Sequence, residues 1–392
     1  MQNGSVKLRH LWVLIFLFVL GVGGLIYFKT APYQHSLSAL IGIWEGFYEI
    51  NPNLVDSNFV IYKSGGYDGQ FFYFLAKDLF DSGDWGLIVD SYHFRFHRIG
   101  LSLFSGFISH FIGFSYYPAI TLSFLFLLFF VSVFCLYSLL PEKSKWYVIF
   151  YLFSPFSLNA NLLLVADSLF VSFGIIAFYF FKNKKDYLAV FFFLLMVLTR
   201  ELGVLFLLPI VLKNLSEKKW EKMILYSIPG FAFLCLVGYG WIHPPNHLGT
   251  NPLGFRDMTD LPLFGFFKSF QEGESFQFKL KEFPKILFFI SFLTLSITSI
   301  QSLKKSFSTD IYLLFPILGS LFVILIAEQG YWRSFDNLSR MFTLILPFSL
   351  LLNDALKRPF LRLFLGISIT LFVFFIVRIL WITPTKEYFL SL

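Results

Sequence analysis

Long, continuous apolar runs dominate the pattern of residues along the chain. The first covers 11–28 and the last 360–381, and each can cross a bilayer as a helix, which takes about 20 residues. The strands of an outer-membrane barrel would instead alternate apolar and polar positions. Further apolar segments lie near 98–114, 118–140, 146–162, 164–181, 187–212, 223–242, 285–303, 310–328 and 341–353. The pattern predicts an all-α polytopic membrane protein, a bundle of about 10–11 transmembrane or re-entrant helices.

The composition supports a protein that lies in a lipid bilayer. Hydrophobic residues make up 57% of the chain and charged residues 14%, whereas a soluble domain carries about 25% charged residues. This excess is too large for one soluble core, so the composition excludes a soluble enzyme, a disordered chain and a nucleic-acid-binding domain. Cys135 and Cys235 both lie in apolar runs without metal-ligand spacing. We therefore expect both to be small packing residues.

The net charge of +7 is explained by membrane topology. The N-terminus and the short connectors between apolar segments carry 16 of the 31 Lys and Arg residues but only 6 of the 24 Asp and Glu residues. Lys and Arg in short loops mark the cytoplasmic side of a membrane. The sequence therefore predicts a multi-pass protein of the cytoplasmic (inner) membrane with a cytoplasmic N-terminus and no nucleic-acid partner. The basic connectors are 142–145, 182–185, 213–222, 304–305 and 357–358.

Two segments fit this topology only as irregular elements. Segment 187–212 has basic connectors at both ends, yet it is too short for two full spans. We expect two half-helices with an outer turn at 199–203. Segment 98–114 is expected to be re-entrant or to lie along the outer interface, because 98–140 must cross only once. Non-helical backbone at membrane depth is tolerated where it lines a cavity.

The remaining polar residues gather on the outer face of this topology. The chain is expected to form one integral membrane domain, 1–392, with a first extracytoplasmic loop at 30–97 that contains interfacial helices. A second extracytoplasmic loop is expected at 243–284. Ionisable residues at membrane depth are costly and point to function. Several acids and arginines at one depth predict a single site.

The most specific segment of the chain is the first outer loop around Asp68. Asp68 lies between Tyr67 and Gly69, and an Asp-Gly pair favours a tight turn. The aromatic run that follows is expected to form a short helix along the interface. A partly desolvated carboxylate held there next to arginines is a candidate general base. The alternative is that Asp68 only caps the helix through its side chain.

Four short motifs resemble a known family of membrane enzymes. Segment 67–76, just outside the first span, resembles the first outer loop of GT-C glycosyltransferases. The order of the later features is most similar to the GPI mannosyltransferase II group and its bacterial relatives. Those features are 97–100, then 153–156 followed by 164–170 as a single outer-turn motif, and 198–203. The resemblance covers roughly 60–210, and only hydropathy extends it to the C-terminal half.

The resemblance implies a transfer reaction at the outer membrane surface. A sugar, a hexose such as mannose, would pass from a polyprenyl-phosphate donor to a lipid, glycan or protein acceptor with inversion, and Asp68 would be the general base. The planar guanidinium suits phosphate, so Arg98, Arg200 and Arg340 are candidate clamps, although arginines at helix ends also snorkel. The other expected substrate-binding residues are Tyr67, Gln70, Asp167 and Glu201. Asp167 departs from the family, whose members more often have Glu there.

A metal site is an open alternative on the second outer loop. Asp257 and Asp260 are three residues apart, and carboxylates of this kind bind divalent ions such as Mg²⁺ or Mn²⁺. His243 and His247 are four apart, but the prolines between them oppose the helix that would align them. A solvated loop face is the default interpretation of both pairs, and no other cofactor is expected.

Two other classes of function compete with the transferase. A transporter or flippase of lipid-linked glycans would place its polar site near the midplane and often shows internal repeats. The two halves of this chain show no repeat, and their polar residues favour one face. A non-catalytic scaffold subunit would require Asp68 to be exposed and isolated.

Overall fold

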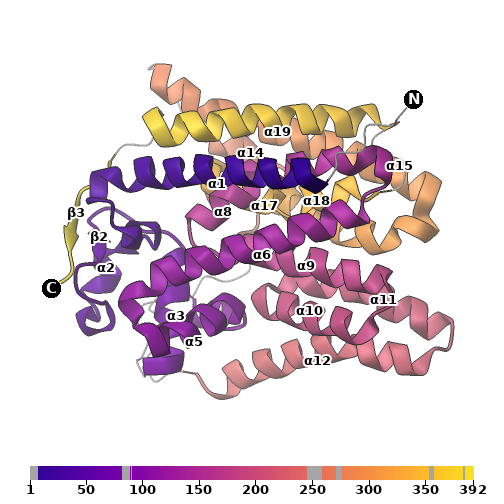
Figure 1. Cartoon of the computed structure of the whole chain (residues 1–392), viewed down its shortest axis with the longest axis horizontal. Helices are drawn as coiled ribbons and strands as arrows, with labels where there is room; N and C mark the ends of the chain where they lie inside the picture. The colour runs from indigo at the N-terminus through magenta and orange to yellow at the C-terminus, as the bar shows by residue number, and fades with distance from the viewer. Residues whose placement is uncertain are drawn as a thin grey trace.

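The protein is an all-α polytopic membrane protein (Figure 1). The computed structural model describes residues 8–81, 89, 91–244, 258–270, 276–352, 357–382 and 385–392. Within these residues, five helical stretches are long and apolar enough to span a membrane: Arg9–Tyr33, Phe114–Leu139, Trp220–Ile242, Leu280–Lys304 and Pro359–Ile382. Three shorter apolar helices are Gly100–Ile112, Asp186–Thr199 and Asp310–Ile326. A bilayer is therefore the environment of this chain.

Most elements are helices, and a few short strands accompany them. The first half contains α1 (Leu8–Thr30), α2 (Glu45–Tyr48), α3 (Gly69–Asp81), α4 (Tyr92–Phe96), α5 (Gly100–Ile112), α6 (Tyr117–Leu139), α7 (Val148–Leu152), α8 (Pro155–Leu162), α9 (Asp167–Lys182) and α10 (Asp186–Thr199). The second half contains α11 (Val204–Ser216), α12 (Trp220–Ile242), α14 (Phe264–Ser269), α15 (Phe276–Ile326), α16 (Gln329–Arg333), α17 (Phe335–Phe342), α18 (Ile345–Leu350) and α19 (Pro359–Val377). The strands are β1 (Ile43–Trp44), β2 (Val60–Tyr62) and β3 (Tyr388–Leu390).

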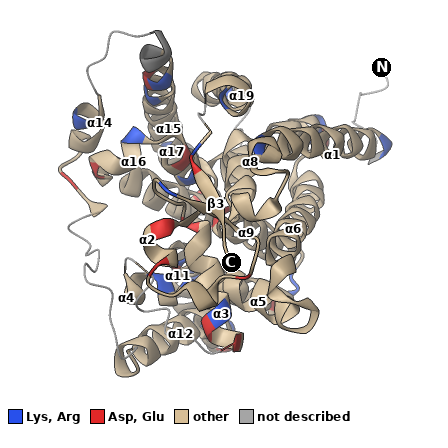
Figure 2. Ribbon diagram, turned by 90° about the vertical axis from the view of Figure 1, so that its left-hand side faces the viewer, with Lys and Arg blue, Asp and Glu red and all other residues tan. Residues whose placement is uncertain are grey.

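The long helices lie side by side with their axes roughly aligned. In Figure 1 the N-terminus lies at one end of this bundle and β3 at the other. Viewed from the β3 end, α1, α6, α12 and α19 stand around the edge, and α8 and α9 lie nearer the centre (Figure 2). The apolar outer faces of these helices are exposed, as for Phe16 (62%) and Phe231 (68%). Such faces suit contact with lipid.

Two predicted basic connectors, 182–185 and 213–222, meet at one end of the bundle. Lys222 pairs with Asp186 at 2.7 Å, which joins the connector before α10 to the connector after α11. The Lys213 Nζ lies 5.4 Å from the ring centre of Tyr312, and Phe181 packs edge-on against the same ring. Segment 187–212 therefore enters and leaves at one end, as the sequence predicted. Its two halves, α10 and α11, are joined by a 3₁₀ turn at Glu201–Gly203.

The longest helix, α15, reverses its direction within its length. It comprises 51 residues, so a straight helix would be about 76 Å long. However, α14 contacts both halves: Phe266 stacks on Phe289 with ring centres 4.4 Å apart, and the Leu263 N–H donates to the Leu325 carbonyl at 2.7 Å. The predicted reversal near the basic pair 304–305 is thus present. α15 begins at Phe276, before its apolar part Leu280–Lys304, so this helix starts within the segment predicted as the second outer loop.

Three predicted apolar segments are not continuous spans. Segments 146–162 and 341–353 are each divided into short helices, and α9, in 164–181, has 16 residues. Pro155 starts α8, and Pro347 lies in α18. These pieces are buried among other helices, where neighbouring protein satisfies interrupted backbone. Hydropathy therefore predicted more uninterrupted spans than the described residues contain.

A small sheet, which the sequence analysis did not predict, organises the first outer loop. β1 pairs in parallel with β2, and β3 near the C-terminus pairs antiparallel with β2. The Ser391 hydroxyl accepts the Phe59 N–H at 2.8 Å and donates to the Asp56 carbonyl at 2.6 Å. The C-terminal segment thus closes the cap formed by 30–97.

The arrangement of connectors predicts that the two ends of the bundle face opposite compartments. In a Cys135→Ser/Cys235→Ser background, we expect an impermeant maleimide to label Glu387→Cys, an exposed cap position, in intact cells. Lys218→Cys, in an exposed connector, should be labelled only after permeabilisation, because basic connectors stay in the cytoplasm. Labelling of both positions from the same side would contradict this topology.

Candidate functional site

Close backbone packing holds the turn that carries Asp68. A Cβ on Gly69 would lie 2.7 Å from the carbonyl oxygens of both Ile41 and Leu163, so only glycine fits this approach. The N–H of Tyr67 donates to the carbonyl of Gly42 at 2.9 Å. α3 then begins at Gly69, and its aromatic first turns are buried. The turn and helix are as predicted, but the helix is packed into the protein instead of lying on its surface.

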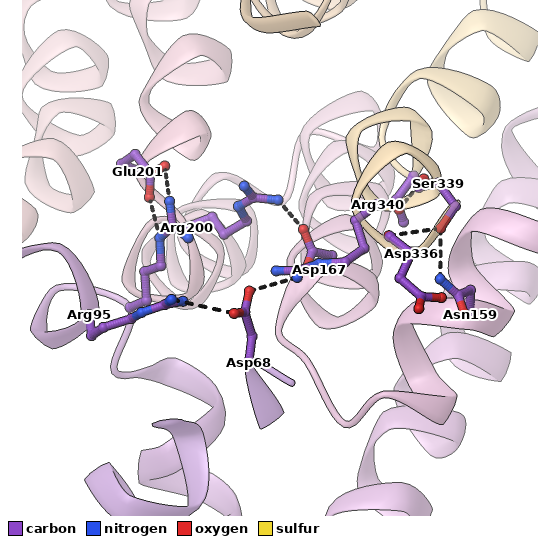
Figure 3. A network of polar contacts seen from close by, with 11 residues as sticks. Asp68, Arg95, Asn159, Asp167, Arg200, Glu201, Asp336, Ser339 and Arg340 are labelled. Atoms are coloured by element: carbon purple, nitrogen blue, oxygen red, sulfur yellow. Dashed lines mark hydrogen bonds and ion pairs between the residues drawn. The ribbon is translucent and has the colours of Figure 1, made fainter. Parts of the chain in front are cut away.

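Asp68 belongs to a network of arginines and carboxylates (Figure 3). Its Oδ1 accepts from Arg95 at 3.3 Å and its Oδ2 from the Arg340 Nη1 at 2.6 Å. The Arg340 Nε donates to Asp167 Oδ2 at 2.8 Å, and Arg200 donates to Asp167 Oδ1. Asp68 is thus neither isolated nor a helix cap, since both of its oxygens bind guanidinium groups. We call these residues, with the pair described next, the arginine network.

A second ion pair of the network lies beside the first. Arg98 donates to both oxygens of Glu201, from Nε at 2.9 Å and from Nη2 at 2.6 Å. The His97 Nε2 is 3.7 Å from the same carboxylate. Arg98 is buried and stacks over the Phe94 ring at 3.9 Å. The 3₁₀ turn between α10 and α11 therefore contacts the end of the first outer loop.

The structure brings together six of the residues predicted for the site. These are Asp68, Arg98, Asp167, Arg200, Glu201 and Arg340, from separate elements. Gln70 has a different role: it is buried, and its Oε1 accepts the Trp44 N–H at 3.0 Å, which ties β1 to α3. Tyr67 lines a neighbouring cavity near the network. The prediction of Gln70 as a substrate-binding residue is thus not supported by its position.

The network carries one more positive than negative charge. It contains four arginines and three carboxylates. The Nε of Arg200 is buried and finds no hydrogen-bond partner among the described residues. A small cavity lies next to it, lined by Asp167, Arg200, Ser320 and Arg340. An unsatisfied guanidinium donor at a cavity is suited to an anionic oxygen.

The arginines keep the carboxylates ionised. Burial alone would raise the pKa of Asp68, but the positive charges of Arg95 and Arg340 outweigh it and hold the pKa well below its usual value. Glu201 behaves in the same way: burial opposes ionisation, and Arg98 with the hydrogen bond from His97 lowers its pKa well below normal. Both groups are therefore anions at neutral pH.

Another ion pair lies beside the arginine network, and neither of its residues was among the predicted site residues. Arg378, after α19, donates to both oxygens of Asp336 in α17 at 2.6 and 2.7 Å. On the same side, the Asn159 amide donates to Ser339 at 2.7 Å. Arg378 interrupts the last apolar segment, and a charge at such a position is itself a signal of function. Arg95 was also absent from the predicted set, although it lies three residues before Arg98.

The proposed metal ligands do not form a cluster in the described part of the chain. Asp257 and His247 lie outside the described residues. The Asp260 carboxylate accepts the Leu261 N–H at 2.9 Å and lies 3.4 Å from the Lys268 Nζ. Among the described residues, no three His, Cys, Asp or Glu side chains are grouped to hold a metal ion. The possibility of a divalent ion on this loop therefore receives no support from Asp260.

Removing Arg340 should destabilise the protein strongly. Arg340→Gln leaves Asp68 and Asp167 without a shared partner, and breaking a buried ion pair costs about 3–5 kcal/mol. We expect a clear decrease in Tm in detergent. Arg333→Gln is the matched control, because Arg333 is exposed and, among the described residues, its side chain bonds to Gln329 alone at 3.3 Å. Equal Tm values for the two variants would show that the network contributes little to stability.

The lowered pKa of Asp68 predicts acid sensitivity with a definite sign. Stability from a carboxylate with a depressed pKa is complete above its unfolded value near 3.8 and is lost as the pH falls toward the folded value. We expect a constant Tm between pH 5 and 8 and a decrease below about pH 4. In Asp68→Asn this acid-induced decrease should be smaller. An identical pH profile in both proteins would contradict the assigned pairing.

Comparison with known proteins adds no relative to this description. No family model, no curated protein and no solved structure matches the chain. The features that bear on function are therefore the membrane architecture, the arginine network and the cavities beside it.

Proposed function

We propose that the protein is a GT-C-type glycosyltransferase that uses a polyprenyl-phosphate sugar. The observation that carries the proposal is the convergence of Asp68 with arginines from distant segments of the chain. The sequence resemblance of the Asp68 loop to that family supports the same reading. We place the reaction on the extracytoplasmic side of a cytoplasmic membrane, and the transferred sugar is a hexose such as mannose.

The donor side of the proposed site is the arginine network. A sugar bound through a lipid phosphate presents an anion, and the network has an excess positive charge. Arg200 contributes its unpartnered Nε, and Arg340 lines the same cavity. Guanidinium groups bind phosphate through two parallel hydrogen bonds. The same cations stabilise the negative charge that grows on the phosphate as it leaves.

The acceptor side of the proposed reaction depends on Asp68. The carboxylate removes the proton from an acceptor hydroxyl, whose oxygen attacks the anomeric carbon. The bond between that carbon and the phosphate oxygen breaks, and polyprenyl phosphate leaves with the electron pair. One displacement inverts the anomeric carbon. No second carboxylate is needed to protonate the leaving group, unlike in glycoside hydrolysis, because phosphate is already a stable anion.

Donor binding also adjusts the strength of the base. Asp68 is a weak base while Arg95 and Arg340 neutralise it. A phosphate that engages Arg340 competes with Asp68 for the same guanidinium. The loss of that partner raises the proton affinity of Asp68. In this proposal, the base becomes effective only when the donor is present.

The proposal predicts the loss of transfer in Asp68→Asn. Removing a general base costs about 10²–10⁴-fold in rate, and the amide keeps the shape of the side chain. The purified variant in nanodiscs should be tested with a radiolabelled polyprenyl-phosphate hexose and extracted membrane acceptors. Asp81→Asn is the control, because Asp81 lies at the far end of α3 and pairs with Lys77 at 3.1 Å. It should retain transfer.

Two results would contradict the proposed enzyme. Full transfer by Asp68→Asn would remove Asp68 from its role as base. Movement of an intact lipid-linked glycan across the bilayer by the wild-type protein, without transfer of sugar, would favour the transporter alternative.

A further inference from the structure

A second and larger cavity lies beside the arginine network. It is larger than the cavity beside Arg200 and opens to the outside of the protein. It lies between the end of α1, the end of α19 and the segment before β3. We call it the basic pocket and define it by Lys29, Tyr67, Asp336, Arg378 and Lys386. The proposed donor site does not use this cavity, and Tyr67 is the one predicted site residue that lines it.

The basic pocket has an excess of positive charge. Arg378 is paired with Asp336, but the two lysines have no carboxylate within 4 Å among the residues that the structure describes. The Lys29 Nζ donates to the Leu162 carbonyl at 2.7 Å, and the Lys386 Nζ to the Gly65 carbonyl at 2.7 Å. Each ammonium has three donors. The pocket can therefore offer several donors and two net positive charges to an anion.

The position of the pocket suits the phosphate of a membrane lipid. Lys29 and Arg378 lie near the ends of two apolar helices, α1 and α19, that run from the same end of the bundle (Figure 1). A lipid phosphate lies at this depth, just outside the hydrocarbon layer. Phe28, 57% exposed, forms part of the wall and can contact a lipid chain. A snorkelling lysine would extend to water, whereas Lys29 bonds to a carbonyl of the neighbouring chain segment.

Two segments of the chain contribute residues both to the basic pocket and to the arginine network. Asp336 in the pocket and Arg340 in the network are four residues apart in α17, so they lie on one face of the helix. Tyr67, whose ring lines the pocket, directly precedes Asp68. In Figure 3, Asp336 and Asn159 lie on the opposite side of Arg340 from Arg95, Arg200 and Glu201. Asp68 therefore stands between two cationic regions.

The geometry of an in-line displacement determines which substrate each of the two cationic regions would bind. In an inverting transfer, the acceptor oxygen and the leaving phosphate lie on opposite faces of the anomeric carbon. With the donor phosphate in the arginine network, the acceptor approaches from the other side, which is the side of the basic pocket. A phosphate anchored there would leave the hydroxyl groups of its head group near Asp68. Two anion sites thus match two substrates of one reaction.

We propose that the basic pocket binds the phosphate of an anionic membrane lipid, and that this lipid is the glycosyl acceptor. The second half of this statement rests on the proposed function, whereas the binding of the lipid does not. Lys29 and Lys386 hold the phosphate, and Arg378 is kept in place by Asp336. Tyr67 contributes its ring and hydroxyl to the wall near the reacting hydroxyl.

Native mass spectrometry of the full-length protein tests the binding directly. The probes are phosphatidylglycerol, which has a phosphate and free hydroxyls, phosphatidylcholine, undecaprenyl phosphate and inorganic phosphate. The variant Lys29→Gln/Lys386→Gln removes two charges without leaving a carboxylate unpaired. Lys63→Gln is the matched control, since Lys63 is an exposed cap lysine whose one ion pair within the described part of the chain is with Glu387 at 3.7 Å. Tm measurements establish that the variants are folded.

We expect the double variant to bind phosphatidylglycerol about tenfold more weakly, because charge-assisted hydrogen bonds are lost. Its affinity for undecaprenyl phosphate should be unchanged, and Lys63→Gln should behave as the wild type. Unchanged phosphatidylglycerol binding would overturn the proposal. A selective loss of undecaprenyl phosphate would assign the pocket to the donor and overturn the acceptor role. Equal competition by inorganic phosphate would show a free-anion site instead of a lipid site.

A transfer assay separates this proposal from the proposed function. If the protein transfers sugar, Lys29→Gln/Lys386→Gln should raise the KM for the acceptor lipid about tenfold while leaving the KM for the donor unchanged. If Asp68→Asn retains full transfer but the double variant loses lipid, the proposed base is wrong and the lipid site stands. If the double variant keeps both lipid binding and acceptor KM, the lipid site is wrong whatever Asp68 does.

Discussion

The structure depends on the cost of placing charged side chains away from water. An isolated charge in a medium of low dielectric constant is so unfavourable that it persists only with partners of opposite sign. Here each carboxylate of the network is held by at least one guanidinium, and Arg340 links Asp68 to Asp167. Three elements distant in sequence must therefore meet at Arg340. This requirement fixes the relative positions of the first outer loop, α9 and α17.

The ion pairs of the arginine network also orient the site before a ligand binds. The carboxylates and guanidiniums are already oriented before any ligand arrives, so little reorganisation is needed when charge changes in the cavity. The single excess positive charge and the unpartnered Nε of Arg200 leave the network incomplete. An anion would complete it. The same logic applies to the basic pocket, where Lys29 and Lys386 rely on backbone carbonyls.

Much of this arrangement could be predicted from the sequence, because the bilayer restricts what an apolar segment can become. Hydropathy and basic connectors predicted the helical bundle, the reversal within α15 and the hairpin around Arg200. Ionisable residues next to apolar segments led to most of the network. Each of these inferences uses a local pattern of apolar or charged residues, and a charged residue at membrane depth is energetically costly.

The features that the sequence did not predict depend on contacts between distant segments, which a local sequence pattern does not show. Gln70 stands in the most specific motif, yet its amide ties β1 to α3, which only the pairing of distant segments reveals. Segments 146–162 and 341–353 are apolar, but they are divided into short helices and buried because other helices surround them. Arg378 was overlooked because an arginine near the end of an apolar helix also fits a simple membrane anchor.

The pairing of β3 with β2 has a consequence for how the protein matures. These strands are more than 300 residues apart, as the contact of Phe59 with Ser391 shows. Ribosomes release the chain from its N-terminus onward, so the first outer loop is made long before the strand that completes its sheet. The cap and the basic pocket can therefore form only after the last helix has been inserted. Until then the first outer loop lacks the strand that completes its sheet, so the cap and the basic pocket are completed late in biogenesis.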